Sequence, residues 1–548
     1  MLLDQYALYA QFSTFIPLGF LMMLRLMRTL MNRATKKRAS SYSSRLSYSV
    51  DYPGGTMLNQ LVWWLGGDVK IAGYYLGRKS QFLLSSLWTV CFLFLSINET
   101  GNDYFHLTKR FGIVGTSQLP ILYLLSLKRL NPVAYAFHMS HETVNQWHRI
   151  LGRIVYLLVT LHGGLYINFY IRSSSFGNAF FRAVPVLGIL ALTGITVLNT
   201  AAISMIRRYS YRVFFFTHII VAFALPPIIW FHVPYSRAFV AESFVLLVLD
   251  LFLRSFSTVQ SLATVEKVPG TDLVKIVAKV PSKCWAHFAT HPASHAYLSI
   301  PARSGTIREP LLSPLLRYGF LLNPFTVASV REGTRKLTFV MRVKNGPLTK
   351  SFDHLTSQDE HTGSTKVIVR IDGPYGATSK FSILESSSFD YILLVAGGVG
   401  ATFIMPLYER LIANNVSAEV KVVWAVQNAN ETSWPILSTQ ESIYNDPRVD
   451  IYTTGTKLDL DANDSGSGSH IEDVEMNIWK DGRSVPVGDR QRPDFQRIVD
   501  QIFVKNHYKR IAVVVCGPVP MSQDLRQAVG VWVKKSKDIW FHSESFGL

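Results

Sequence analysis

The stretches that decide the fold are Trp147–Tyr166, WHRILGRIVYLLVTLHGGLY, and Phe214–His232, FFFTHIIVAFALPPIIWFH. Each is an apolar segment that carries two histidines fourteen residues apart: His148 and His162 in the first, His218 and His232 in the second. In an α-helix, fourteen residues turn almost four full circles and rise roughly 21 Å. The two histidines of each helix therefore lie near one face, towards opposite sides of a bilayer. Two such helices, parallel and side by side, place the four imidazoles in two facing pairs.

A facing pair of imidazoles can hold a haem iron from both sides. A single histidine in a membrane helix is often a hydrogen-bond donor between helices. Four histidines with one spacing repeated in two helices favour ligation, because ionisable groups are costly in hydrocarbon and tend to be functional. The sequence therefore predicts two stacked haem sites, with structural histidines as the alternative. His138 and His141 precede the first segment without matching partners, and we expect them to be loop residues.

The composition indicates a membrane protein with a soluble half. The chain has 548 residues, of which 48% are hydrophobic, and the apolar residues are concentrated before residue 256. A chain of this length can form several domains. The net charge of +18 is assigned to membrane topology and anionic cofactors, since no nucleic-acid-binding module is recognisable. The three cysteines are far apart and form neither a disulfide framework nor a zinc motif.

Seven apolar stretches are candidate membrane spans. They cover about residues 6–24, 81–97, 111–127, 148–170, 183–205, 213–233 and 238–256. The loop between the first two is strongly basic, so the positive-inside rule places it in the cytosol and the N-terminus outside. Seven spans then bring the C-terminal half to the cytosol. In this orientation His148 and His218 meet near the cytosolic face, and His162 and His232 meet near the outer face.

Four arginines near the cytosolic histidines are candidates for holding haem propionates through charge-assisted hydrogen bonds. They are Arg149, Arg153, Arg208 and Arg212. The alternative is ordinary anchoring of basic side chains at the membrane surface. Pro226 and Pro227 fall between the two histidines of the second segment and are expected to bend that helix.

After Ser255 the pattern changes to short alternating strands, which indicates a small antiparallel barrel. Strands are expected near 261–268, 273–280, 294–300, 320–329 and 336–344. From residue 366 onward, apolar strands near 391–396, 419–426 and 510–516 alternate with helical segments. This arrangement favours a parallel sheet in a nucleotide-binding domain. A polar insertion at 457–494 interrupts that domain and is expected to be mobile.

A glycine-rich turn, AGGVGAT at residues 396–402, directly follows a strand and opens a helix. Glycines let the backbone approach a pyrophosphate, and the helix N-terminus contributes N–H groups and a partial positive charge. A later strand ends in Cys516-Gly517-Pro518, at the carboxyl edge where open parallel sheets bind ligands. The alternative for Cys516 is a buried core thiol.

Together these motifs resemble the ferric reductase and NADPH oxidase superfamily of membrane flavocytochromes b. The resemblance covers roughly residues 80–548. It rests on the paired His-x13-His helices, His148-Arg149-x-x-Gly152-Arg153, Asn323-Pro324-Phe325-Thr326, Asp372-Gly373-Pro374-Tyr375-Gly376, the Gly397–Gly400 turn and Cys516-Gly517-Pro518. The short N-terminus resembles the compact yeast branch of probable, NADPH-oxidase-like metalloreductases.

The resemblance implies a domain order. Residues 1–80 would be an N-terminal span and basic cytosolic loop, 81–256 a multi-pass helical bis-haem domain, 257–380 an antiparallel FAD-binding β-barrel, and 381–548 an α/β NAD(P)H-binding domain. The last two would form a ferredoxin-reductase-like module.

The resemblance also implies cofactor-binding residues. Those for FAD are Asn323, Pro324, Phe325, Thr326, Arg342, Gly346, Thr349 and Phe546. Those for NADPH are Gly397, Gly398, Gly400, Thr402, Arg492, Cys516 and Gly517. The family usually has histidine at the place of Asn323, and asparagine cannot carry a charge. Arg492 is a candidate for the 2′-phosphate, with a solvated loop arginine as the alternative. No residue is assigned as a catalytic acid or base.

The implied function is electron transfer from cytosolic NADPH through FAD and two b-type haems to an acceptor across the membrane. Ferric or cupric ions are the acceptors expected first. One alternative is an NADPH oxidase that makes superoxide from O2, another is a degenerate scaffold without flavin, and a non-haem transporter is the weakest. The plasma membrane or the endoplasmic reticulum is expected to hold the chain, in contact with lipid. The sequence leaves the oligomeric state open.

Overall fold

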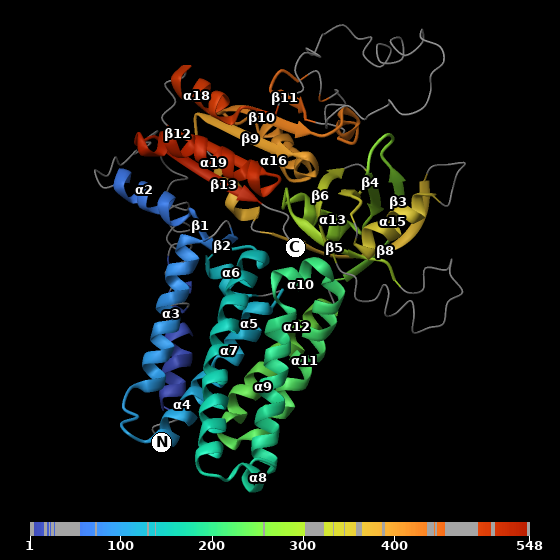
Figure 1. The fold of residues 1–548 in the computed structure, drawn as a ribbon. Helices are drawn as coiled ribbons and strands as arrows, with labels where there is room; N and C mark the ends of the chain where they lie inside the picture. Colours follow the sequence, from blue (N-terminus) through green and yellow to red (C-terminus); the bar gives the residue numbers. More distant parts are fainter. Residues whose placement is uncertain are drawn as a thin grey trace, which may run out of the picture. The chain divides into compact units, whose positions relative to one another are not determined.

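The computed structural model describes most of the chain. The described residues are 5–15, 55–71, 74–128, 131–137, 139–255, 258–301, 323–331, 334–344, 346–357, 364–376, 378–385, 389–435, 446–454, 492–505 and 510–544, with a few isolated positions between them. They divide into two compact units, one covering Met1–Thr258 and the other Val259–Pro374 with Thr378–Gly547. Each unit is described by itself (Figure 1).

The first unit is a bundle of apolar helices. Among its described residues, four helices are long and apolar enough to cross a membrane: α3 (Lys79–Ile97), α7 (His141–Arg172), α9 (Ala183–Ala201) and α11 (Tyr211–His232). The other described elements are α2 (Gly55–Leu65), β1 (Asp68–Ile71), β2 (Tyr74–Arg78), α4 (Tyr104–Ser117), α5 (Leu119–Ser126), α6 (Pro132–Phe137), α8 (Phe176–Ala179), α10 (Ser204–Tyr209), η1 (Pro234–Ser236) and α12 (Arg237–Ser255).

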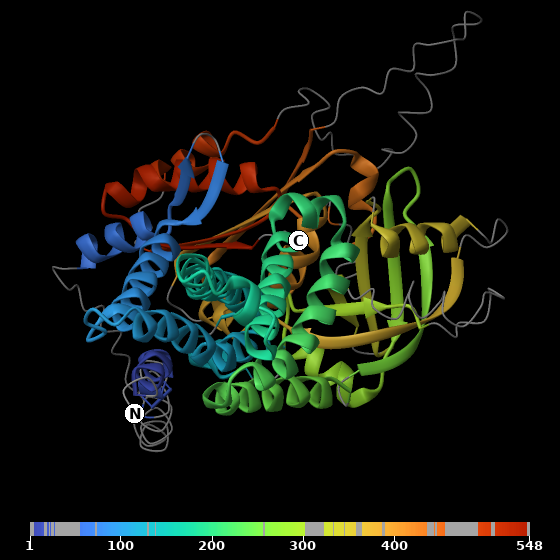
Figure 2. The ribbon, with the colours of Figure 1, turned by 60° about the horizontal axis from the view of Figure 1, so that its bottom comes forward.

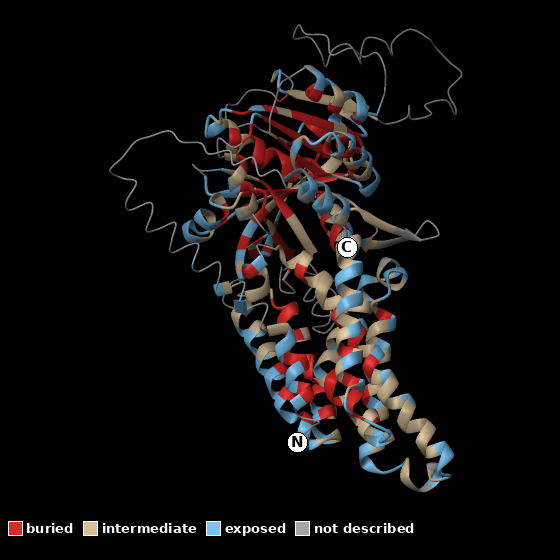
Figure 3. Cartoon of the chain, turned by 90° about the vertical axis from the view of Figure 1, so that its left-hand side faces the viewer, coloured by how far each residue is buried: buried red, intermediate tan, exposed pale blue. Residues whose placement is uncertain are grey.

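The outer faces of these helices are apolar and exposed. Leu87 on α3 is 65% exposed and Phe231 on α11 is 68% exposed, and exposed positions line the outside of the bundle (Figure 3). Helices that are apolar all round and unburied suit a hydrocarbon surrounding. The first unit is therefore a membrane domain, while the number of its crossings stays a prediction.

Two boundaries differ from the expected ones. The stretch 111–127 forms two helices that meet at Gln118, because Pro120 has no N–H and its ring clashes with a preceding carbonyl inside a helix. The helix expected at 148–170 begins at His141, where the Ser140 hydroxyl accepts a hydrogen bond from the Thr143 N–H at 3.3 Å. The expectation of a loop at His141 is therefore wrong. His138 lies outside the described residues, as do positions 16–18, 21 and 24 of the stretch 6–24, of which residues 6–15 are helical.

Helices α7, α9 and α11 form the centre of the bundle. Helix α11 packs along α9, and α7 packs against α4, α5 and α9. The side chains of Leu151, Val155 and Leu158 on α7 are buried between them. Pro226 and Pro227 both lie inside α11, which continues from Tyr211 to His232.

The second unit begins with a closed antiparallel barrel of six strands, which confirms the expected barrel (Figure 2). Its strands, in the order β3-β4-β7-β6-β5-β8, are β3 (Thr258–Lys267), β4 (Leu273–Lys279), β7 (Lys336–Arg342), β6 (Asn323–Arg331), β5 (His295–Ser299) and β8 (Ser364–Tyr375). Alternate residues of β4, Val274, Ile276 and Ala278, are fully buried inside it, as the period of a strand requires. Helices α13 (Ser282–Ala289) and α15 (Pro347–Ser357) accompany the barrel.

A five-stranded sheet follows, and all its strand pairs are parallel as expected. In the order β11-β10-β9-β12-β13, its strands are β11 (Val449–Thr453), β10 (Glu419–Val426), β9 (Tyr391–Gly397), β12 (Arg510–Cys516) and β13 (Asp538–Glu544). The helical elements are η2 (Thr378–Glu385), η3 (Gly398–Gly400), α16 (Ala401–Ala413), η4 (Ala429–Thr432), α18 (Phe495–Lys505) and α19 (Val519–Lys534). The strands β11 and β13 were not expected. The insertion at 457–494 lies outside the described residues up to position 491.

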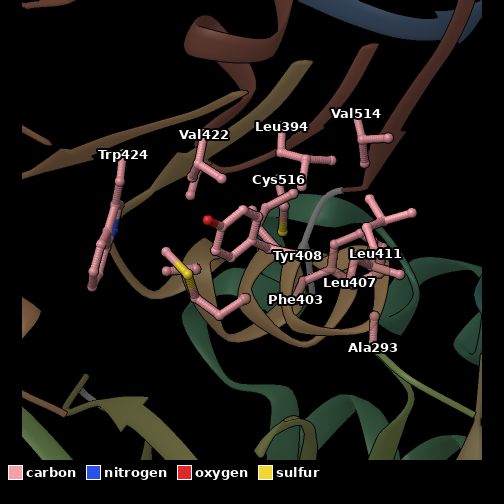
Figure 4. Close-up of a cluster of buried hydrophobic side chains, with 14 of the residues drawn as sticks. Ala293, Leu394, Phe403, Leu407, Tyr408, Leu411, Val422, Trp424, Val514 and Cys516 are labelled. Atoms are coloured by element: carbon pink, nitrogen blue, oxygen red, sulfur yellow. The ribbon is translucent and has the colours of Figure 1, made fainter. Parts of the chain in front are cut away.

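Helix α16 joins the sheet to the barrel. Phe403, Leu407 and Leu411 face Leu394 and Val514 of the sheet (Figure 4), and the same buried cluster includes residues of the barrel. Burying a large apolar side chain contributes about 1.5–3 kcal/mol. One shared core therefore holds the glycine-rich turn at the start of α16 next to the barrel.

A carboxylate on α16 should make the stability of this unit depend on pH. Burial raises the pKa of Glu409 to about 7, opposed by the nearby Arg331 charge. A carboxyl whose pKa is raised by folding contributes stability at low pH and loses it as pH rises through the folded-state value. We expect the thermal midpoint of the wild type to fall between pH 5 and pH 8, and that of Glu409→Gln to fall less, by tryptophan fluorescence. Parallel pH dependence in the two proteins would contradict this expectation.

Candidate functional site

The four histidines with the repeated spacing lie in two facing pairs. His148 of α7 and His218 of α11 have ring centres 6.1 Å apart, with ring planes at 60°. We call them the first pair. His162 and His232 have ring centres 6.5 Å apart, with ring planes at 86°, and form the second pair. Because α7 and α11 run in the same direction, the equal spacing on both brings each histidine opposite its partner.

Both distances fit imidazoles on opposite sides of one metal ion. A metal–imidazole nitrogen bond is about 2.0 Å long, and that nitrogen lies about 1.2 Å from the centre of its ring. Two rings on opposite sides of one iron therefore have centres about 6.4 Å apart. The observed 6.1 and 6.5 Å bracket this value.

Main-chain carbonyls fix the orientation of three of these rings. The Nδ1 atoms of His148, His162 and His232 lie 2.9, 2.8 and 2.8 Å from carbonyl oxygens of α5, α4 and α9. A carbonyl only accepts, so Nδ1 donates and Nε2 keeps its lone pair, which is the form that binds a metal. His218 differs, because its buried Nδ1 has no hydrogen-bond partner among the described residues.

The structure describes the side chains of two of the four arginines expected near the first pair. Arg149 is half-buried beside His148, and Arg153 is exposed. Arg208 lies on α10 and Arg212 on α11, with side chains outside the described set.

Arg207 is a basic residue that the sequence analysis did not single out. Its guanidinium carbon is 5.9 Å from the centre of the Phe214 ring. That ring in turn packs against the His218 ring, with centres 5.3 Å apart. Nothing in the sequence singles out Arg207, because its contact with Phe214 depends on packing between helices.

The glycine-rich turn and the Cys516-Gly517-Pro518 segment pack backbone against backbone in the second unit. A Cβ on Gly400 would lie 2.1 Å from the Cys516 carbonyl oxygen, and one on Gly397 would lie 2.7 Å from the Pro518 Cδ. Gly398 has a φ of +54°, which favours glycine. The buried Thr402 hydroxyl donates to the Val399 carbonyl at 2.8 Å. The structure thus brings together two segments that the sequence analysis assigned to NADPH.

Cys516 is the last residue of β12 and is fully buried within the cluster of Figure 4. Burial is the main cause that raises the pKa of its thiol well above the usual range, and the charge of Glu544 raises it further. The thiol therefore stays neutral. Glu544 lies opposite Cys516 in the β12–β13 pairing, and its Oε2 is 2.9 Å from the His542 Nε2. Sequence analysis missed Glu544 because it did not recognise β13.

The described residues expected to bind FAD lie on the barrel strands β6 and β7 and at the start of α15. Thr326 on β6 is buried, while Asn323, Pro324 and Phe325 are half-buried. Gly346 precedes α15, where the Thr349 hydroxyl donates to the Gly346 carbonyl at 3.0 Å. Phe546 lies outside the described residues. Arg492, expected to meet the 2′-phosphate, is exposed in the loop before α18.

Arg342 ends β7 and contacts the neighbouring nucleotide-binding domain. Its guanidinium forms an ion pair with the largely buried Glu431 and donates a hydrogen bond to Gln427. A Cβ on Gly398 would lie 3.6 Å from its Nη2 atom. The guanidinium, the Thr349 hydroxyl and the first N–H groups of α15 are the kinds of donor that bind a pyrophosphate. These residues therefore fit the phosphates of FAD.

Three families match successive parts of the chain. Residues 111–229 match a family described as "Ferric reductase like transmembrane component". Residues 257–379 match "FAD-binding domain", and residues 389–530 match "Ferric reductase NAD binding domain".

Curated relatives and a solved structure are similar over most of the chain. The chain is 21% identical over 474 residues to "Ferric/cupric reductase transmembrane component 2" of Schizosaccharomyces pombe, covering 79% of this chain and 80% of that protein. It is 23% identical over 499 residues to "Probable metalloreductase AIM14" of Scheffersomyces stipitis, covering 85% and 86%. A flavohemoglobin from Malassezia yamatoensis with bound FAD and heme is 15% identical, covering 79% and 96%, with a TM-score of 0.36.

Proposed function

Since the chain belongs to the ferric reductase and NADPH oxidase superfamily, we propose that it carries electrons from NADPH through FAD and two b-type haems to ferric or cupric ions across a membrane. It is an oxidoreductase with an apolar helical domain followed by FAD-binding and NAD(P)H-binding domains. The observation that carries the proposal is the two histidine pairs, with ring centres 6.1 and 6.5 Å apart. The names of the relatives support metal ions as acceptors.

The helical domain would fix the positions and surroundings of the haems. When bound, the cofactors would supply hydride transfer, conversion of an electron pair to single electrons, and one-electron transfer. The first and second pairs would each hold one iron, with the Nδ1–H donors of three rings fixing their orientation. Leu151, Val155 and Leu158 lie between the pairs on α7, and their burial keeps water away. A dry, low-dielectric surrounding is one means of setting a haem's potential.

The second unit would bind and orient the two nucleotides. Backbone N–H groups at the start of α16 would face the NADPH phosphates. Arg342 and Thr349 would face the FAD pyrophosphate. Cys516 would border the nicotinamide as a neutral thiol, and this neutrality keeps a nucleophilic thiolate away from the reacting ring.

Measurement of the products tests the acceptor. Purified, detergent-solubilised chain is given NADPH and a ferric chelate under argon, and Fe(II) is followed with a chromogenic chelator. We expect two Fe(II) for each NADPH oxidised, because a hydride carries two electrons. Superoxide production in air, with no Fe(II) or Cu(I) formed under argon, would replace the metalloreductase by an oxidase. A chain that binds no flavin would support the scaffold instead.

Replacing Arg342 should weaken FAD binding. Charge-assisted hydrogen bonds contribute about 1.5–3 kcal/mol, so Arg342→Leu is expected to raise the Kd for FAD by about 10–100-fold. Glu431→Gln, which releases Arg342 from its ion pair, should leave the affinity equal or tighter. The measurement is a flavin fluorescence titration of flavin-depleted protein at fixed salt.

Lys336→Leu is the matched control for that titration, because it removes the same charge from the exposed other end of β7. It should bind FAD as the wild type does. Equal weakening by Lys336→Leu and Arg342→Leu would mean that only net charge matters, and would overturn the role assigned to Arg342.

A further inference from the structure

Each histidine of the second pair lies directly against a glycine of a neighbouring helix. A Cβ on Gly112 of α4 would lie 2.7 Å from the His162 Nδ1 and 2.8 Å from its Cε1. A Cβ on Gly188 of α9 would lie 2.7 Å from the His232 Cε1. Both distances are far shorter than a normal contact between non-bonded carbon atoms, about 3.5–4.0 Å. There is no room for a methyl group at either glycine while the histidines keep their positions.

The two contacts share one geometry. His162 donates to the Thr108 carbonyl, four residues before Gly112, and His232 donates to the Val184 carbonyl, four residues before Gly188. In an α-helix the N–H of residue i+4 points at the carbonyl of residue i. Each imidazole therefore lies over one turn of the neighbouring helix, between a carbonyl that accepts its proton and a glycine that leaves space for its ring.

The first pair lacks this arrangement. His148 donates to the Leu122 carbonyl, and the residue four positions later is Ser126. His218 has no Nδ1 partner among the described residues.

The register of α9 against α11 offers a reason for this difference. Gly188 contacts His232, and Gly194 contacts Val221 and Leu225, so the two helices are antiparallel. Fourteen residues back along α11, at His218, the matching turn is the last one of α9, from Leu198 to Ala202, the residue that follows the helix. That turn has the same backbone hydrogen bond, 3.0 Å from the Ala202 N–H to the Leu198 carbonyl. An alanine stands there in place of the glycine.

We propose that Gly112 and Gly188 are positioning residues for the second haem site. Because they have no side chain, His162 and His232 can approach the α4 and α9 backbones closely enough to donate Nδ1–H. This contact turns their Nε2 atoms towards each other across the site. The proposal rests on the haem-binding function proposed above, and it adds two residues that do not themselves touch the iron.

Four alanine variants of the full-length, detergent-solubilised chain test it. Gly112→Ala and Gly188→Ala should lower haem from about two towards about one per chain, by the pyridine haemochrome assay, and should remove one of two components from a potentiometric titration. Gly115→Ala and Gly194→Ala are the controls on the same helices. Their new Cβ atoms would lie 3.2 Å from aliphatic Cγ1 atoms of Val159 and Val221. Both controls should keep two haems and both components.

Alanine favours a helix more than glycine does, so haem loss in the test variants would run against helix propensity. Two haems and unchanged potentials in Gly112→Ala and Gly188→Ala would overturn the proposal. Equal haem loss in the control variants would also overturn it, because general packing would then explain the effect. A wild type without haem would instead overturn the function proposed above.

If the alanine variants do not fold well enough to be purified, a reciprocal variant tests the proposal. Ala202→Gly removes the methyl group at the register position that corresponds to His218 and should let the His218 Nδ1 donate to the Leu198 carbonyl. Such a hydrogen bond raises the basicity of a metal-bound imidazole. A more basic ligand favours the ferric state, so the potential of one component should fall while the other stays. If neither potential moves, backbone access at these positions does not control the histidines, and the proposal fails.

Discussion

His162→Ala is expected to leave about one haem per chain in place of two, and to slow NADPH-driven metal reduction at least about 100-fold. The loss removes one of the two rings whose centres lie 6.5 Å apart in the second pair. It also leaves the Thr108 carbonyl without the imidazole donor that it has in the wild type. Haem content by pyridine haemochrome and Fe(II) formation under argon measure the two effects on the same preparation.

His141→Ala is the matched control, because His141 begins the same helix and lies outside both pairs. It should keep two haems and the wild-type rate. Unchanged haem in His162→Ala, or equal loss in His141→Ala, would contradict the assignment of the second pair to an iron.

Gly400→Ala is expected to slow reduction of the bound flavin by NADPH roughly 100-fold. The new Cβ would lie 2.1 Å from the Cys516 carbonyl oxygen and 2.7 Å from its carbonyl carbon. Both are main-chain atoms at the end of a central strand, so they cannot move aside without shifting β12. Overpacking costs of about 3 kcal/mol correspond to roughly a 100-fold loss in rate. Anaerobic stopped-flow measurement of flavin absorbance after mixing with NADPH gives the rate.

Dithionite is the control for that experiment, since it reduces flavin without using the nucleotide site. It should reduce the flavin of Gly400→Ala as fully as that of the wild type. NADPH reduction within a few-fold of the wild-type rate would show that the two segments can separate without loss of function.

Most of the fold could be predicted from sequence patterns with a fixed period. The alternation in the barrel strands comes from burial on one face, and the apolar strands around Leu394 and Val514 are buried on both faces. Both kinds of burial give a pattern of apolar residues that can be recognised in the sequence. Strand β13 was missed because its partner β12 is apolar from residue 511 to residue 516, whereas Asp538–Glu544 carries polar residues at four of its seven positions. Glu544, the last residue of this strand, was therefore not predicted either.

The candidate site was predictable where it depended on spacing along one helix. The fourteen-residue interval, together with the parallel orientation given by the predicted spans, placed His148 with His218 and His162 with His232. Contacts between helices were not predictable in this way. Gly112 and Gly188 look like any glycine of an apolar helix, and only the approach of a histidine ring distinguishes them from Gly115 and Gly194.

Arg342 shows the same limit in the second unit. The resemblance assigned it to FAD binding, but its ion pair with Glu431 joins residues 89 positions apart. A contact between residues so far apart cannot be predicted from a local sequence pattern. The break between α4 and α5 was a different kind of omission, since Pro120 was visible in the sequence and its effect on the helix follows from its missing N–H.

The most direct test of the whole account is an anaerobic optical titration of the full-length, flavin-loaded chain with NADPH. Two b-type haems per chain should become reduced by NADPH to the same final extent as by dithionite. Fewer than two haems, or haems that dithionite reduces and NADPH does not, would contradict the account, because the two histidine pairs would then not form an electron path from the nucleotide site.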